Sequence, residues 1–358
     1  MERYLHIIQE EIPTVSNEDL YLDIKKSSLN SLELLMVRGV LERYFNLVVP
    51  DEIWYSQKTL EESLRYFHEN FNPENISLKS TVEEVEFSEK VEIRMPQMSN
   101  EGLSESWLLK YLGDFHWNLI SKGFSKTSSQ FFDIEGQRLY ATFVRINYEL
   151  SALSQFVENE LISFIGKMDS FGKSTLISNI YGKTDNNYLH AKLFTVFSVK
   201  SESANVISKA RMDGIESKIP QLINANSFIS DYSVVKKGLS EVVQTQFGEF
   251  NISGSEVMFE IPYRINPFSD INGVGLLYFA SYPMISDACL LQYEGLKKYD
   301  SFSTVFRDVF YFGNCSKSEI IIFRLNFLKE SREGLKIVTS LLRQSDNELI
   351  AKIITVKK

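Results

Sequence analysis

Hydrophobic residues in the first 70 positions recur at intervals of three and four, which is the spacing of one face of an α-helix. Three such runs occur, at residues 2–11, 31–45 and 60–68. Pro13 and Pro50 close the first two runs, because proline cannot continue a helix. Thr59 and Glu62 form a capping-box pair ahead of the third run. The pattern predicts a small bundle of three short helices.

From about residue 90 the pattern changes to a long apolar helix followed by strand-like runs, and this order occurs twice. The two predicted helices, 103–121 and 274–291, are apolar nearly all round, as a helix enclosed by a sheet must be. Pro283 is expected to kink the second helix. The predicted strands are 139–148, 161–168, 174–181 and 188–199 in the first copy, and 302–312, 319–327, 335–343 and 349–356 in the second. The pattern predicts an α+β body with two antiparallel sheets, each wrapped around a central helix.

Residues 70–92 are polar and acidic with little periodicity, which is typical of a linker. The predicted domains are a helical domain at 1–78, a linker at 79–92, a first repeat at 93–200, an inter-repeat connection at 201–245 and a second repeat at 246–358.

The amino-acid composition limits the classes of protein to which this chain can belong. The 44% hydrophobic and 24% charged residues are those of an ordinary globular protein. The sequence has no apolar run of about 18 residues that could cross a membrane, and the charged N-terminus lacks a signal-peptide core. The two cysteines, Cys289 and Cys315, fit a reducing cytoplasm. Four dispersed histidines, none at metal-ligand spacing, predict no metal site.

Charge is unevenly distributed along the chain. Residues 1–78 carry 14 acidic and 7 basic side chains, so they hold −7 of the chain's net charge of −9. This balance argues against nucleic acid as a partner. An acidic surface on the first domain is instead expected to attract basic partner enzymes.

The segment Ser28–Leu35, with the sequence SLNSLELL, resembles the G-L-D-S-L signature of acyl and peptidyl carrier proteins. Further matches follow at that family's spacings: Leu41-Glu42-x-x-Phe45, Val49-Pro50-Asp51 and Thr59-Leu60. The resemblance implies that Ser31 is the attachment point of a 4′-phosphopantetheine arm, which a phosphopantetheinyl transferase would add. A serine at a helix N-terminus suits this role, because free backbone N–H groups favour a phosphate.

One residue departs from the carrier pattern. Asn30 stands where the family usually has aspartate, which leaves the acceptance of this domain by the transferase open. The alternative is that Ser31 only caps a helix and that the domain serves for docking. Taking Ser28 as the modified serine would put Phe45 and Pro50 out of register.

The body resembles the hotdog fold, in the form of a fused double hotdog. Residues 270–282, DINGVGLLYFASY, are similar to the second-helix signature of the leinamycin-pathway bifunctional acyltransferase/decarboxylase family. Pro96-Gln97-Met98 and Gly113-Asp114-x-x-Trp117 also resemble that family, and 95–120 most resembles a sister branch of uncharacterised biosynthetic proteins. The resemblance covers about residues 90–358.

The hotdog resemblance implies that the N-terminus of each central helix faces a thioester carbonyl, where free amides stabilise an oxyanion or enolate. Gly102, Gly273 and Gly275 would let the backbone approach a ligand closely. Asn272 would either cap the second helix or donate a hydrogen bond to the acyl group.

The leinamycin-pathway family also implies a tyrosine nucleophile in the strand after the first helix. Tyr140 is the nearest candidate and Tyr148 the other tyrosine of that stretch. If Val144 or Ile146 instead occupies the position of the family's tyrosine, the chain lacks this nucleophile and cannot acylate itself. Tyr140 as an ordinary core aromatic is the alternative. A phenol needs activation to attack an acyl-CoA, which Arg138 or Arg145 could supply by lowering its pKa.

A hotdog dehydratase would need a histidine paired with a carboxylate. His116 falls inside a predicted buried helix and His190 in a predicted strand, so both are expected to be structural.

These features lead to one main functional hypothesis. The chain is expected to be an acyl-thioester enzyme of polyketide or fatty-acyl secondary metabolism. It would transfer, and decarboxylate, a malonyl- or methylmalonyl-type group from acyl-CoA to a carrier-protein arm, its own at Ser31 included. The alternatives are a thioesterase or simple acyltransferase on carrier-bound chains, and a non-catalytic module that docks carriers or binds acyl groups in an assembly line.

Overall fold

The structure is a computed structural model. It describes residues 2–24, 26–45, 49, 51–70, 84–100, 102–172, 174–200, 207–209, 217–222, 227–253, 256–296, 301–332 and 334–358.

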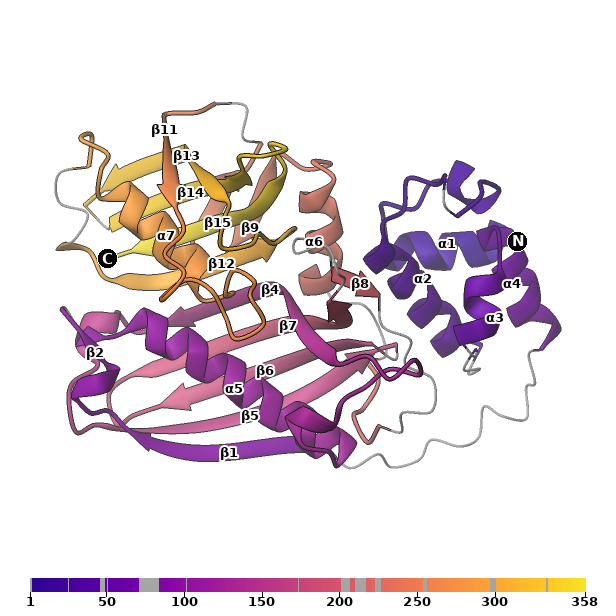
Figure 1. Cartoon of the computed structure of the whole chain (residues 1–358), viewed down its shortest axis with the longest axis horizontal. Helices are drawn as coiled ribbons and strands as arrows, with labels where there is room; N and C mark the ends of the chain where they lie inside the picture. Colours follow the sequence, from indigo (N-terminus) through magenta and orange to yellow (C-terminus); the bar gives the residue numbers. More distant parts are fainter. Residues whose placement is uncertain are drawn as a thin grey trace.

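The N-terminal residues form a helical bundle, which lies beside helix α6 of the body (Figure 1). Its elements are α1 (Glu2–Glu11), the 3-10 turn η1 (Glu18–Leu20), α2 (Ser31–Tyr44), α3 (Asp51–Ser56) and α4 (Leu60–Glu69). The three predicted helices are confirmed, whereas the short α3 was not predicted. The backbone N–H of Glu62 donates to Thr59 Oγ1 at 3.1 Å, as the capping pair requires.

The body is built on one antiparallel sheet with the strand order β1-β5-β6-β7-β4-β12-β15-β14-β13-β11 (Figure 1). The strands of the first half are β1 (Val85–Glu92), β4 (Leu139–Leu150), β5 (Leu161–Phe171), β6 (Thr175–Lys183) and β7 (Tyr188–Lys200). Those of the second half are β11 (Phe259–Arg264), β12 (Thr304–Tyr311), β13 (Ile320–Ser331), β14 (Gly334–Arg343) and β15 (Leu349–Lys357). The halves join where β4 pairs with β12, in the register that sets Arg307 opposite Tyr148.

One apolar helix lies against each half of the sheet. Helix α5 (Glu105–Phe124) contacts β1, β5, β6 and β7, and α7 (Ser281–Leu290) contacts β11, β13 and β14. Buried side chains of both helices belong to one continuous apolar core. The predicted α+β class is therefore confirmed, but the strands of both halves form one continuous sheet instead of the two predicted sheets, because β4 pairs with β12.

A second apolar cluster covers the outer face of the sheet and continues into the bundle. It includes α6 (Ser227–Lys236) and the hairpin of β9 (Val242–Thr245) and β10 (Gly248–Asn251). The remaining elements are β2 (Met98–Ser99), β3 (Gly102–Leu103), β8 (Ile207–Lys209) and the 3-10 turns η3 (Met95–Gln97), η4 (Ser128–Gln130) and η5 (Leu153–Gln155). In the described ranges, no helix has the length and apolar character needed to span a membrane.

Three predictions need correction. The predicted helix 274–291 begins only at Ser281, and residues 272–279 form a non-helical turn that an isolated bridge between Ile271 and Leu277 closes. Pro283 is therefore the third residue of α7, where a missing N–H breaks no helical hydrogen bond, so it causes no kink of the predicted kind. Residues 85–92, assigned to the linker, form the edge strand β1. The edge strand β11 was missed as well.

Candidate functional site

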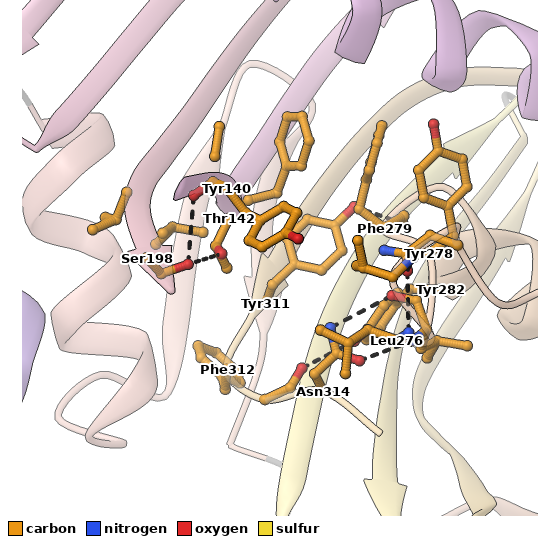
Figure 2. Close-up of a pocket in the computed structure, with 18 of the residues that line it drawn as sticks. Tyr140, Thr142, Ser198, Leu276, Tyr278, Phe279, Tyr282, Tyr311, Phe312 and Asn314 are labelled. Carbon is orange, nitrogen blue, oxygen red and sulfur yellow. Dashed lines mark hydrogen bonds between the residues drawn. The ribbon is translucent and has the colours of Figure 1, made fainter. Parts of the chain in front are cut away.

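A cavity of about 730 Å³ lies where the two halves of the body meet the bundle. Its walls come from the middle of α5, the start of β4, the turn 272–279, the end of β12 and α6. Asn30 and Leu35 of the bundle complete the lining. Figure 2 shows the side chains of Tyr140, Thr142 and Ser198 across the cavity from Leu276, Tyr278 and Asn314. The cavity thus brings together residues that are far apart in sequence.

Five tyrosines line this cavity: Tyr140, Tyr232, Tyr278, Tyr282 and Tyr311. Three of them donate to backbone carbonyl oxygens, at 2.8 Å for Tyr232, 2.9 Å for Tyr282 and 3.1 Å for Tyr311. Among the described residues, the hydroxyls of Tyr140 and Tyr278 have no hydrogen-bond partner. Only these two hydroxyls are therefore free to react with or position a ligand.

Tyr140 is held at the start of β4 by its neighbours. It pairs in register with Ser198 of β7, whose hydroxyl contacts the Tyr140 carbonyl oxygen at 3.5 Å and Thr142 Oγ1 at 2.5 Å. The Arg138 guanidinium lies 6.0 Å from the centre of the Tyr140 ring. Arg138 is fixed there by two hydrogen bonds of 2.6 Å to backbone carbonyls of η4. Of the two arginines proposed from the sequence, Arg138 is thus the one that lies near the Tyr140 ring.

The other candidate positions on β4 offer no free hydroxyl. Val144 lines the cavity with an apolar side chain, and Ile146 is fully buried in the core. Tyr148 is buried and donates to Glu105; burial together with the Glu105 charge raises its pKa well above the usual value. Arg145 is buried against Asp308, with 2.6 Å between Nη2 and Oδ2. Among the four candidate positions on β4, Tyr140 alone brings a hydroxyl to the lining of this cavity.

The turn 272–279 presents backbone to the cavity instead of a helix end. Asn272 Oδ1 accepts hydrogen bonds from the backbone N–H groups of Val274 and Leu276, both at 3.1 Å. Asn272 therefore shapes a tight turn and does not cap α7, which begins nine residues later. Gly275 adopts a φ of +80°, a conformation that favours glycine. Gly273 lines the cavity, and a Cβ at this position would meet no described atom within 4 Å.

Gly102 lies away from the cavity. Its φ is +138°, and a Cβ there would lie 2.3 Å from the carbonyl oxygen of Leu153. The space before α5 is thus filled by the protein's own backbone, and Ser104 caps that helix by accepting from the Trp107 N–H at 3.3 Å. Of the two glycine segments proposed from the sequence, only the second reaches the cavity.

Helix α2 begins at Ser31, as predicted. Asn30 Oδ1 accepts from the Glu33 N–H at 3.1 Å, and Glu33 Oε2 accepts from the Asn30 N–H at 2.8 Å. Asn30 and Glu33 therefore form a reciprocal capping pair at the start of α2. Ser28 is instead bound to Asp19, at 3.1 Å from hydroxyl to carboxylate. Because Asn30 lines the cavity, the first turn of α2 lies at the cavity wall.

Charged groups surround the cavity and include Lys110, Lys200 and Lys236. The Lys110 ammonium lies 5.9 Å from the centre of the Tyr278 ring. Burial and the Asp114 charge raise the pKa of Tyr278, which keeps that phenol protonated. Burial lowers the pKa of Lys236. Tyr278 is thus a better hydrogen-bond donor than nucleophile, and the lysines suit a carboxylate or phosphate.

Neither histidine serves this site. His116 is fully buried, with its ring nitrogens 2.7 Å from Ser178 Oγ and 2.8 Å from Thr195 Oγ1. Burial lowers its pKa to about 3. His190 stacks on Tyr181 with ring centres 4.3 Å apart. The described lining residues include no histidine and no cysteine, and no described group of three or more His, Cys, Asp or Glu could hold a metal ion.

The buried His116 predicts a specific loss of stability in acid. Its pKa is about 3 in the folded chain and 6.5 ordinarily, so unfolding takes up a proton between these values. The stabilisation is complete above about pH 6.5 and declines as the pH falls towards 3. Going from pH 7 to pH 5 should remove about 2 kcal/mol of unfolding free energy through this ring. Urea titrations of the wild type and His116→Gln test this, since equal losses in both proteins would contradict it.

Sequence reasoning missed several residues of the site. Tyr278 lies within the segment 270–282 that carried the family resemblance. Its position in that segment was therefore a sequence signal that could have marked it as a candidate site residue. Asn314 accepts from the Leu277 N–H at 3.0 Å and thereby fixes the turn, but it comes from the far end of β12. Such a contact across 37 residues has no local sequence pattern.

No family model matches the chain, and no curated protein matches its sequence. Solved structures do match. The 12:0-ACP thioesterase from Umbellularia californica has a TM-score of 0.55 and 10% identity, over 76% of this chain and 94% of that one. An acyl-ACP thioesterase from Bacteroides thetaiotaomicron has a TM-score of 0.49 and 11% identity, over 76% of this chain and 98% of that one. A MaoC-like dehydratase from Phytophthora capsici has a TM-score of 0.40 and 9% identity, over 77% and 97%.

At 10% identity, the likeness to the plant thioesterase shows the fold alone. The large antiparallel sheet that wraps around apolar helices is a hotdog fold, as the sequence pattern predicted.

Proposed function

We propose that this protein is an acyl-thioester enzyme. Its body, a fused double hotdog, would transfer an acyl group of the malonyl or methylmalonyl type from CoA to a phosphopantetheine arm on Ser31 of a carrier-type bundle. The observation that carries the proposal is the composition of the cavity. One wall holds the free hydroxyl of Tyr140, a second is the turn at Gly273, and a third is the bundle surface at Asn30.

Tyr140 would act as the acyl acceptor. Its phenol oxygen attacks the thioester carbonyl, the carbon–sulfur bond breaks, and the proton of the phenol goes to the departing CoA thiol. Gly273 lies on another wall of the cavity, and its backbone N–H would stabilise the charge that develops on the carbonyl oxygen.

Decarboxylation would use the same groups. Loss of carbon dioxide from a malonyl-type group breaks a carbon–carbon bond and leaves the electron pair on an enolate, which then takes a proton from solvent. The Gly273 turn would stabilise this enolate as it does the oxyanion. Lys110, beside Tyr278, suits the carboxylate of the incoming group.

The residues at the start of α2 fit a phosphopantetheine arm. Asn30 caps the helix, so the N-terminal turn is formed, and the same residue borders the cavity. A phosphate at Ser31 would meet the positive end of the helix dipole. When bound, the arm supplies the thiol that accepts the acyl group.

Hydrolysis is the second candidate, because the structural neighbour with the same fold is named as a thioesterase that acts on a 12:0 acyl carrier. Water would then replace the arm as the acceptor. A third possibility is a body that only binds carrier-borne groups. Release of free acid identifies a thioesterase, and absence of turnover identifies a binding module.

Intact-protein mass spectrometry tests the proposal. The chain is co-expressed with a broad-specificity phosphopantetheinyl transferase and then incubated with malonyl-, methylmalonyl- or acetyl-CoA. We expect the mass of one arm, absent in Ser31→Ala, followed by the mass of one acyl group after decarboxylation. A chain that accepts the arm but no acyl group from any of the three would contradict the proposed transfer. A chain that never accepts the arm would contradict the role of Ser31.

A further inference from the structure

The bundle contacts the body along one face of α2. Four residues spaced by three or four positions make this contact, namely Glu33, Met36, Gly39 and Arg43. Residues at this spacing lie on the same side of a helix. The contact is therefore an ordered strip along the helix that begins with Ser31.

Glu33 anchors the end of this strip nearest to Ser31. Its carboxylate is fully buried and lies 2.9 Å from the Lys237 ammonium, which follows α6 in the body. Thr14 donates to the same carboxylate at 2.6 Å. A buried carboxylate needs such partners, because desolvation of an unpaired charge is costly. One of the partners of Glu33 comes from the body, so the buried carboxylate is fully paired only when the bundle lies against the body.

Gly39 permits the close approach at the middle of the strip. A Cβ at this position would lie 3.2 Å from the Phe171 ring and 3.3 Å from the Gly172 backbone nitrogen. Glycine weakens a helix interior, so contact with the turn between β5 and β6 accounts for its presence in α2. Arg43 extends the strip, with its guanidinium 5.4 Å from the centre of the Phe171 ring.

We infer that this strip docks the bundle on its own body, so that Ser31 is served in cis by the cavity of the same chain. The docking places Asn30 and Leu35 in the cavity wall, and Ser31 directly follows Asn30. A tethered partner acts at a high effective concentration. The docking stands on the contacts alone, whereas loading in cis rests on the proposed function.

Hydrogen exchange of the full-length chain tests the docking without any need for activity. Gly39→Leu forces the helix away from the β5–β6 turn, and Lys237→Ala removes the body's partner of Glu33 while leaving the bundle sequence intact. In both variants, the amides of residues 169–172 and 227–236 should exchange roughly tenfold faster. Arg65→Leu, on the exposed surface of α4, is the matched control and should leave these amides unchanged. Unchanged exchange in both interface variants would overturn the inference.

A mixing experiment tests the loading in cis. Full-length Ser31→Ala has an intact cavity but no arm site, and full-length Tyr140→Phe has an arm site but no acceptor hydroxyl. At micromolar concentrations, the arm on Tyr140→Phe should be acylated by the partner variant at least about 100-fold more slowly than the wild type acylates itself. Equal rates would overturn cis loading and leave the proposed function standing. If the wild type itself is not acylated, the proposed function fails and cis loading with it, while the exchange data still decide the docking.

Discussion

Replacing Tyr140 with phenylalanine is expected to lower kcat/KM for acyl transfer at least about 1,000-fold, because it removes the oxygen that is proposed to carry the acyl group. The ring remains, so its place at the start of β4 beside Ser198 should be unchanged. Single-turnover assays with malonyl-CoA would show CoA release at the level of the uncatalysed reaction. Addition of the arm at Ser31 should proceed normally, since Tyr140 has no part in it.

Two other cavity tyrosines provide the controls. Tyr278→Phe removes the second free hydroxyl, and if that hydroxyl only donates a hydrogen bond, the loss should be about tenfold. Tyr232→Phe removes a hydroxyl that donates to a backbone carbonyl, and its effect should fall mainly on stability. A Tyr140→Phe enzyme with nearly wild-type kcat/KM would show that Tyr140 is an ordinary wall residue.

Replacing Arg307 with methionine is expected to lower the free energy of unfolding by about 3–5 kcal/mol. Arg307 is fully buried at the β4–β12 junction, with Nε 2.7 Å from Glu105 and Nη2 2.5 Å from Asp287. Its removal leaves the buried Glu105 carboxylate without its cation. Because Glu105 belongs to α5 and Asp287 to α7, the loss weakens the joint between the two halves of the body.

Arg324→Met is the matched control, because Arg324 pairs with Glu260 on the sheet surface, where the side chains are 29% and 46% exposed. Such pairs contribute less than about 1 kcal/mol. Urea unfolding of both variants at neutral pH makes the comparison. Equal, small losses would mean that the buried network does not stabilise the junction.

The periodicity of the sequence located most of the body. Apolar runs marked β4 to β7 and β12 to β15 to within a few residues. Some of these strands, such as β12, are buried on both faces, and others, such as β5, alternate between buried and exposed side chains; both patterns are strong signals. The edge strand β1 was read as linker, because its sequence VEFSEKVE exposes many polar side chains. The pattern predicts a helix over the turn 272–279, because Leu276 and Leu277 are apolar and buried there without being helical; Leu277 instead contacts Asn314, beyond the end of β12.

The site could be predicted only in part, for a similar reason. Tyr140, Asn272 and Gly273 were proposed from a family resemblance, and the fold brings all three to one cavity. Gly102 had equal support from sequence, yet its surroundings are filled by Leu153. A repeat pattern cannot reveal which of two related sites remains open, because that depends on packing across the sheet.

The most direct test of the central claim is peptide-level mass spectrometry of the arm-bearing wild type after brief incubation with malonyl-CoA. We expect an acyl group on the Ser31 arm and, at early times, on the peptide that contains Tyr140. Free acid in solution with neither peptide labelled would contradict acyl transfer and identify hydrolysis as the reaction of this cavity.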